Sequence, residues 1–206
     1  VGANVSGTVK FQVKVDDQAT AVDGNGVAAP GILTNTANYI YNNGTAPVPT
    51  QPTNSVDFTV TQSASVAAND SAALSTLIGD DNIVEVATAG QGTTVSFDNY
   101  IWNNGNGTDR FNITYANLTP GSGGFPSGTS FQLFQADGVN VLQDTNSDGI
   151  PDTGALAPGA SYKVVLKATL PADATNLTAP FTVVKTATSV VDPTKTDFVL
   201  DRLLDV

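Results

Sequence analysis

The feature that most limits the fold is a two-residue alternation of apolar and polar side chains, repeated in short segments along the chain. It is clearest in residues 8–15, where Val9, Phe11, Val13 and Val15 face one way and polar residues face the other. Asn, Asp, Gly and Pro separate the segments. This pattern predicts an all-β chain: an Ig-like antiparallel β-sandwich with an N-terminal extension strand and at most one short helix.

One stretch interrupts the strands and suggests how the chain is organised. Residues 69–82 read "NDSAALSTLIGDDN", which predicts a short helix over Ala72 to Ile78 that ends at Gly79. The whole chain can still form one compact domain. The predicted parts are residues 1–62 with N-terminal strands that could serve in assembly, residues 63–90 with the short helix and a connection, and residues 91–206 with the sandwich.

The charge of the chain limits its partners. Its 206 residues carry a formal net charge of -11 with only 8 basic residues, and the sequence pI is about 4.1. Nucleic-acid phosphate and anionic membranes are bound by clustered Lys and Arg, so neither is expected as a partner. No apolar run is long enough for a membrane-spanning helix.

Three residue types are absent, and their absence narrows the chemistry. The chain has no Cys, His or Met. Without His or Cys there is no Ser-His-Asp triad, no cysteine nucleophile and no Cys/His zinc site, so we expect no enzymatic activity. The lack of an initiating Met indicates a chain processed by signal-peptide cleavage, or a fragment, and with it a secreted or cell-surface location.

An acidic loop at residues 144–152 predicts a structural Ca²⁺ site. The stretch "DTNSDGIPD" places oxygen-bearing side chains at alternate positions and a Gly where a calcium loop turns sharply. The bidentate Glu that closes an EF-hand loop is absent, so another loop would have to complete the site. The alternative is a solvated turn between strands. The predicted ligands are Asp144, Asn146, Asp148, the carbonyl of Ile150, and Asp152.

Three longer motifs make the chain similar to a known family. They are "GQGTTVSFDNYIWNNGNGTDRFNIT" from residue 90, "DTNSDGIPDTGALAPG" from residue 144, and "TATSVVDPTKTDF" from residue 186. The chain resembles, over rather more than half its length, the Ig-like conserved-repeat domains of large bacterial surface proteins. The resemblance implies a β-sandwich, an extracellular location, and a structural or adhesive role without catalysis.

Two further features leave alternatives open. Three aromatic residues, Tyr100, Trp102 and Phe111, surround the "NNGNG" turn. They could form a sugar-stacking platform, although the favoured interpretation is that they are core residues.

An intramolecular Lys–Asn or Lys–Asp isopeptide bond, as occurs in some surface sandwiches, is conceivable for Lys10 or Lys163. Nothing in the sequence selects either lysine.

The N-terminal strand suggests how copies of the chain could associate. An amphipathic strand over residues 5–15 can complete its own sheet or add to a sheet of a neighbouring molecule. We therefore predict a structural subunit of an extracellular filament or surface array, joined by strand addition through Val9, Phe11, Val13 and Val15 and stiffened by Ca²⁺. The alternative is a monomeric adhesin or carbohydrate-binding module with a glycan ligand.

Overall fold

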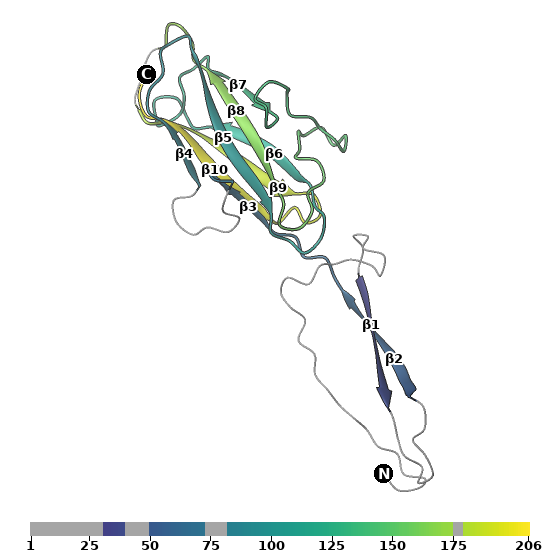
Figure 1. The fold of residues 1–206 in the computed structure, drawn as a ribbon. Coiled ribbons are helices and arrows are strands. Elements are labelled where there is room, and N and C mark those ends of the chain that lie inside the picture. The colour runs from purple at the N-terminus through teal and green to yellow at the C-terminus, as the bar shows by residue number, and fades with distance from the viewer. Residues whose placement is uncertain (1–30, 40–49, 73–81, 175–178) are drawn as a thin grey trace, which may run out of the picture.

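The computed structural model describes residues 31–39, 50–72, 82–174 and 179–206. These residues form ten β-strands, and none of them lies in a helix. The strands build a sandwich of two four-stranded sheets and a separate two-stranded ribbon (Figure 1). The predicted all-β sandwich is confirmed. The body of the predicted helix lies almost entirely outside the described residues.

The first sheet of the sandwich is antiparallel throughout. Its strand order is β3-β5-β8-β7, and β5 and β8 are its long central strands. It consists of β3 (Val66–Asn69), β5 (Thr94–Asn103), β8 (Ser161–Thr169) and β7 (Ser130–Phe134).

The second sheet has the order β4-β10-β9-β6, and its β4–β10 pair is parallel. Both β3 and β4 come from residues 63–90, so this segment contributes one edge strand to each sheet. The second sheet consists of β4 (Ile83–Val86), β10 (Thr196–Leu203), β9 (Phe181–Ser189) and β6 (Phe111–Asn117).

The apolar faces of the two sheets meet in one core. Along β5 the side chains alternate between exposed and buried, as a strand with one face against a second sheet requires. Aromatic rings fill the centre, and Phe97 meets Phe125 edge-to-face with ring centroids 6.2 Å apart. The largest fully buried apolar side chains include Phe97, Phe111, Phe125, Phe181, Ile101 and Ile113.

The ribbon is a hairpin of β1 (Gly31–Tyr39) and β2 (Gln51–Val60), which pair antiparallel. Figure 1 shows it standing apart from the sandwich, at the end where β3 begins. A bulge between Thr36 and Asn38 shifts its register, and Thr36 Oγ1 lies 2.8 Å from Ser55 Oγ.

The chain runs into the sandwich at one end and leaves it at the other (Figure 1). At the first end, β3 pairs with the last residues of β5, and the N–H of Asn104 donates to the carbonyl of Ser65. At the opposite end, β10 finishes beside β4, and the N–H of Ala89 donates to the carbonyl of Asp205. The ten residues of β5 span about 30 Å between these ends.

Candidate functional site

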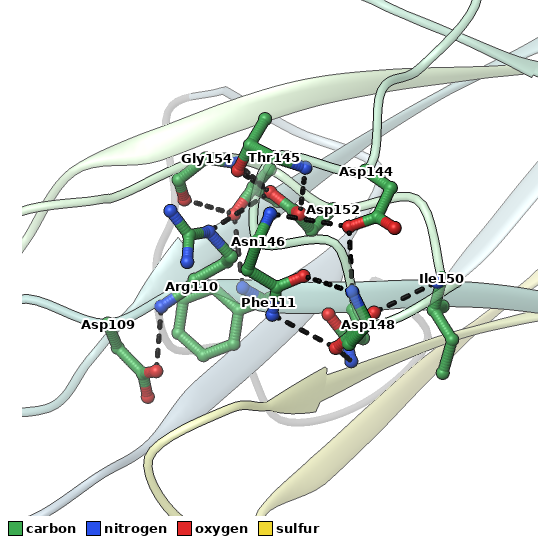
Figure 2. Close-up of polar contacts among 12 residues, drawn as sticks. Asp109, Arg110, Phe111, Asp144, Thr145, Asn146, Asp148, Ile150, Asp152 and Gly154 are labelled. Atoms are coloured by element: carbon green, nitrogen blue, oxygen red, sulfur yellow. Dashed lines mark hydrogen bonds and ion pairs between the residues drawn. The ribbon is translucent and has the colours of Figure 1, made fainter.

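The predicted calcium loop folds around Asp144. Its Oδ1 accepts a hydrogen bond from the N–H of Ser147 at 2.7 Å, and its Oδ2 accepts one from the N–H of Gly149 at 2.8 Å. Ser147 and Gly149 both have positive φ, at 63° and 91°, so the loop turns as sharply as its sequence predicts. Asp144 therefore organises the turn with backbone hydrogen bonds (Figure 2).

Asp148 is held by side-chain amides. Its Oδ2 accepts hydrogen bonds from Nδ2 of Asn112 at 2.7 Å and from Nδ2 of Asn146 at 2.9 Å. Its Oδ1 accepts one from the N–H of Ile150 at 2.9 Å. The hydrogen bond from Asn112 is the largest cause of a pKa of Asp148 below its usual value, and those from Asn146 and Ile150 act in the same direction.

Asp152 is fully buried, and its partners are Thr145, Gly154 and Arg110 (Figure 2). Its carboxylate accepts hydrogen bonds from the N–H and the Oγ1 of Thr145, both at 2.6 Å, and from the N–H of Gly154. Arg110 Nε lies 3.2 Å from its Oδ1. Within the described residues, no three acidic side chains gather in a way that could hold a metal ion. The structure therefore brings three of the predicted ligands together, Asp144, Asn146 and Asp148. The fourth side chain, Asp152, forms an ion pair with Arg110 instead.

The motifs behind the family resemblance meet at the end of the sandwich where the chain enters. Asn103 Nδ2 donates to the carbonyls of Gly107 and Leu156, which joins the "NNGNG" turn to the "LAPG" segment. Ser189 Oγ donates to Asp109 Oδ2 at 2.5 Å, and this bond is buried. These motif residues hold loops together, which is a structural role.

Two other sequence predictions have different outcomes. The predicted assembly strand with Val9, Phe11, Val13 and Val15 lies outside the described residues.

The three aromatic residues around the "NNGNG" turn have different environments. Phe111 is buried in the core, but Tyr100 and Trp102 point outward from β5 and are partly exposed. The favoured interpretation of all three as core residues is therefore wrong for two of them.

A second polar cluster, which the sequence analysis did not identify, lies inside the core. Asn99 on β5, Lys185 on β9 and Asp201 on β10 are buried, with relative exposures of 0%, 1% and 0%. β5 belongs to one sheet, and β9 and β10 belong to the other. The cluster therefore bridges the two layers of the sandwich.

The three side chains contact one another. Lys185 Nζ donates a hydrogen bond to Oδ1 of Asn99, and it lies 3.2 Å from Oδ2 of Asp201. Nδ2 of Asn99 donates to Oδ1 of Asp201 at 3.0 Å. Each oxygen of the Asp201 carboxyl group thus faces a different nitrogen, one from the lysine and one from the carboxamide.

Burial favours the neutral forms of both ionisable groups. It lowers the pKa of Lys185 and raises the pKa of Asp201, and in each case it outweighs the attraction between the two groups. A charged amine and a charged carboxylate are costly to bury even as a pair. The environment therefore favours an uncharged amine beside a protonated carboxyl group.

The alternation that predicts the strands could have revealed this cluster. Lys185 falls between Val183 and Ala187, and Asp201 falls between Val199 and Leu203, so each charged residue occupies a core-facing position of its strand. By contrast Lys163, which the sequence analysis considered for an isopeptide bond, is paired with Asp98 in a partly exposed ion pair at 2.8 Å. Lys10 lies outside the described residues.

Comparison with known proteins adds little to this description. No protein-family model matches the chain, and no curated protein is significantly similar to it. Several solved structures match part of it with low TM-scores. They include a secreted serine protease, VesC, of Vibrio cholerae, with 16% identity over 59% of this chain and a TM-score of 0.37. The others are a PapD-like domain of human CEP192, with 14% identity over 60% and a TM-score of 0.31, and a family 123 glycoside hydrolase of Clostridium perfringens, with 10% identity over 71% and a TM-score of 0.38.

These likenesses carry no conclusion about activity. The match spans 21% of the protease, 79% of the PapD-like domain and 27% of the glycoside hydrolase. Among the described residues of this chain, none forms a helix long and apolar enough to cross a membrane.

Proposed function

We propose that this chain is a structural module of an extracellular filament or surface array, and that it acts on no substrate. The observation that carries the proposal is the path of the chain, which enters the sandwich at one end of β5 and leaves at the other. A module with this path transmits tension along its length when it is linked to neighbours in series. The family resemblance supports an extracellular location.

In this proposal, copies associate by strand addition through residues 5–15. Negative-stain electron microscopy of the purified chain tests the idea directly, and ordered filaments or sheets are expected. Phe11→Asp places a charge on the apolar face of the predicted strand and should abolish assembly. Gln12→Asp adds the same charge to the polar face and should leave assembly intact. A chain that stays monomeric at high concentration, or filaments that survive Phe11→Asp, would contradict the proposal.

Calcium binding by residues 144–152 is the second part of the proposal. The spacing of Asp144, Asn146 and Asp148 supports it, because hard cations prefer carboxylate and amide oxygens. Arg110 opposes it at Asp152, since a cation there would compete with the guanidinium group. Ca²⁺ should raise the melting temperature of the chain and chelation should reverse the gain, whereas Asp148→Ala should show no gain. If Ca²⁺ raises the melting temperatures of the wild type and the variant equally, the loop does not bind the ion.

A glycan-binding module is the second candidate function. The outward direction of Tyr100 and Trp102 on β5 favours it, because aromatic faces at a protein surface stack against sugar rings. Screening the chain against a glycan array would reveal a reproducible sugar preference, and Trp102→Ala should remove it. Phe131→Ala, at a partly buried aromatic residue on β7, serves as the matched control.

A further inference from the structure

We propose that Lys185 and Asn99 join in an intramolecular isopeptide bond, formed without another protein, with Asp201 as the catalytic proton-transfer group. The inference rests on the geometry of the buried cluster and does not depend on the assembly proposed above. It adds a covalent link between the two sheets.

The cluster brings the reacting atoms together. The amine of Lys185 contacts Oδ1 of Asn99, which is bonded to Cγ, so the nitrogen lies beside the carbon that it would attack. The side chains come from central strands of opposite sheets, and the register of these strands holds them in place. Such positioning turns an unfavourable reaction between an amine and a carboxamide into an intramolecular one.

The chemistry balances with the groups present. The neutral amine of Lys185 attacks Cγ of Asn99, and a new C–N bond forms while negative charge develops on Oδ1. Asp201 accepts a proton from Nζ through the oxygen that faces it and delivers a proton to Nδ2 through the other oxygen. The bond between Cγ and Nδ2 then breaks and ammonia leaves. The products are a secondary amide and free ammonia, and Asp201 returns to its initial protonation state.

The surroundings of the cluster suit this reaction. The neighbours of Lys185 on the same face of β9, Val183 and Ala187, are completely buried, and so are Val199 and Leu203 beside Asp201. This apolar environment favours an uncharged amine, which is the form that acts as a nucleophile, and a carboxyl group that carries a proton. It also keeps bulk water away from the carboxamide.

The bond would close a large loop across the core. Asn99 and Lys185 are 86 positions apart, and β5 and β9 belong to different sheets. Separation of the sheets would then require breaking a covalent bond. Among the described residues, Lys185 is the only lysine whose side chain is completely buried.

Intact-mass measurement of the full, unfolded chain tests the proposal. The expected mass is lower than that calculated from the sequence by the mass of one ammonia molecule. Because Asn-Gly sequences can also lose ammonia, the site must be located by trypsin digestion. We expect a branched species that joins the peptide of residues 15–110 to the peptide of residues 168–195, with cleavage after Lys185 blocked.

Variants separate the roles of the three residues. Lys185→Met and Asn99→Ala should restore the full calculated mass for their sequences, and Asp201→Ala should slow or abolish the loss of ammonia. Lys163→Met, at a partly exposed lysine paired with Asp98, should keep the branched peptide. A wild-type chain with its full mass would overturn the proposal whether or not the variants fold, and so would an ammonia loss that maps to other residues. Complete bond formation in Asp201→Ala would remove Asp201 from the mechanism.

Discussion

Replacing Lys185 by Met should cost much more stability than the same replacement at Lys163. Met keeps an unbranched apolar stem but removes the nitrogen, so the bond to Asn99 cannot form. A covalent link between residues 86 positions apart removes about 4–5 kcal/mol of chain entropy from the unfolded state by the loop-closure relation. For a chain of this size, that loss lowers the melting temperature by roughly 10–20 °C.

The control has a small expected effect. Lys163 and Asp98 form a partly exposed ion pair, and their side chains are 27% and 50% exposed. Such surface pairs contribute about 0–1 kcal/mol, so Lys163→Met should shift the melting temperature by only a few degrees.

Differential scanning calorimetry of the wild type and these variants measures the difference. Asp201→Asn keeps the shape of the carboxyl group but blocks proton transfer, so it should lose stability with Lys185→Met. Because both changes remove the same bond, the double variant should lose no more than the larger single loss. If Lys185→Met is as stable as Lys163→Met, the reasoning about the cluster is refuted.

Three other predictions concern the loops. Asp152→Ala should lower the free energy of unfolding by about 1–3 kcal/mol, because it leaves the part-buried donors of Thr145 and the Arg110 guanidinium without their buried acceptor; a loss below about 0.5 kcal/mol in chemical denaturation would contradict this. The pKa of Asp148 lies below its ordinary value of 3.8, so its contribution to stability is present above that pH and is lost as the pH falls through the lower pKa of the folded protein. Asp148→Asn should therefore flatten the acid side of a plot of melting temperature against pH, and an unchanged slope would remove Asp148 as its cause. Ser189→Ala should cost about 1–3 kcal/mol by breaking the buried bond to Asp109, and thermal unfolding at neutral pH would detect it.

The sequence predicts the fold class well because alternation shows which face of each strand is buried. The same alternation gives Asn99, Lys185 and Asp201 core-facing positions, so a search for charged residues on apolar faces would have singled out Lys185 and Asp201. The alternation does not show how the two sheets stack, and so it does not show which residues of one sheet contact which residues of the other. Only the folded structure shows that β5 and β9 place Asn99 and Lys185 against each other.

Local loop chemistry was predicted in part. The positive φ of Gly149 follows from its place in the acidic loop, and the turn around Asp144 has the expected shape. The ion pair of Asp152 with Arg110 was not predicted. Arg110 is 42 positions earlier in the chain, and it approaches Asp152 only when the loop folds against β6. Long-range pairing of this kind leaves no periodic signal in the sequence.

The outward direction of Tyr100 and Trp102 was missed for a different reason. Aromatic residues are usually buried, but their even-numbered positions on β5 place them on the face opposite Phe97 and Ile101. The strand period should therefore have been weighed above residue type.

Single-molecule stretching of the full chain, tethered before β3 and after β10, tests most directly whether this module transmits tension through an internal cross-link. If Asn99 and Lys185 are joined, the 86-position segment between them stays closed under force. Each unfolding step of the wild type should then be shorter than that of Lys185→Met by about 300 Å. Equal step lengths in the two proteins would show that Asn99 and Lys185 are not joined.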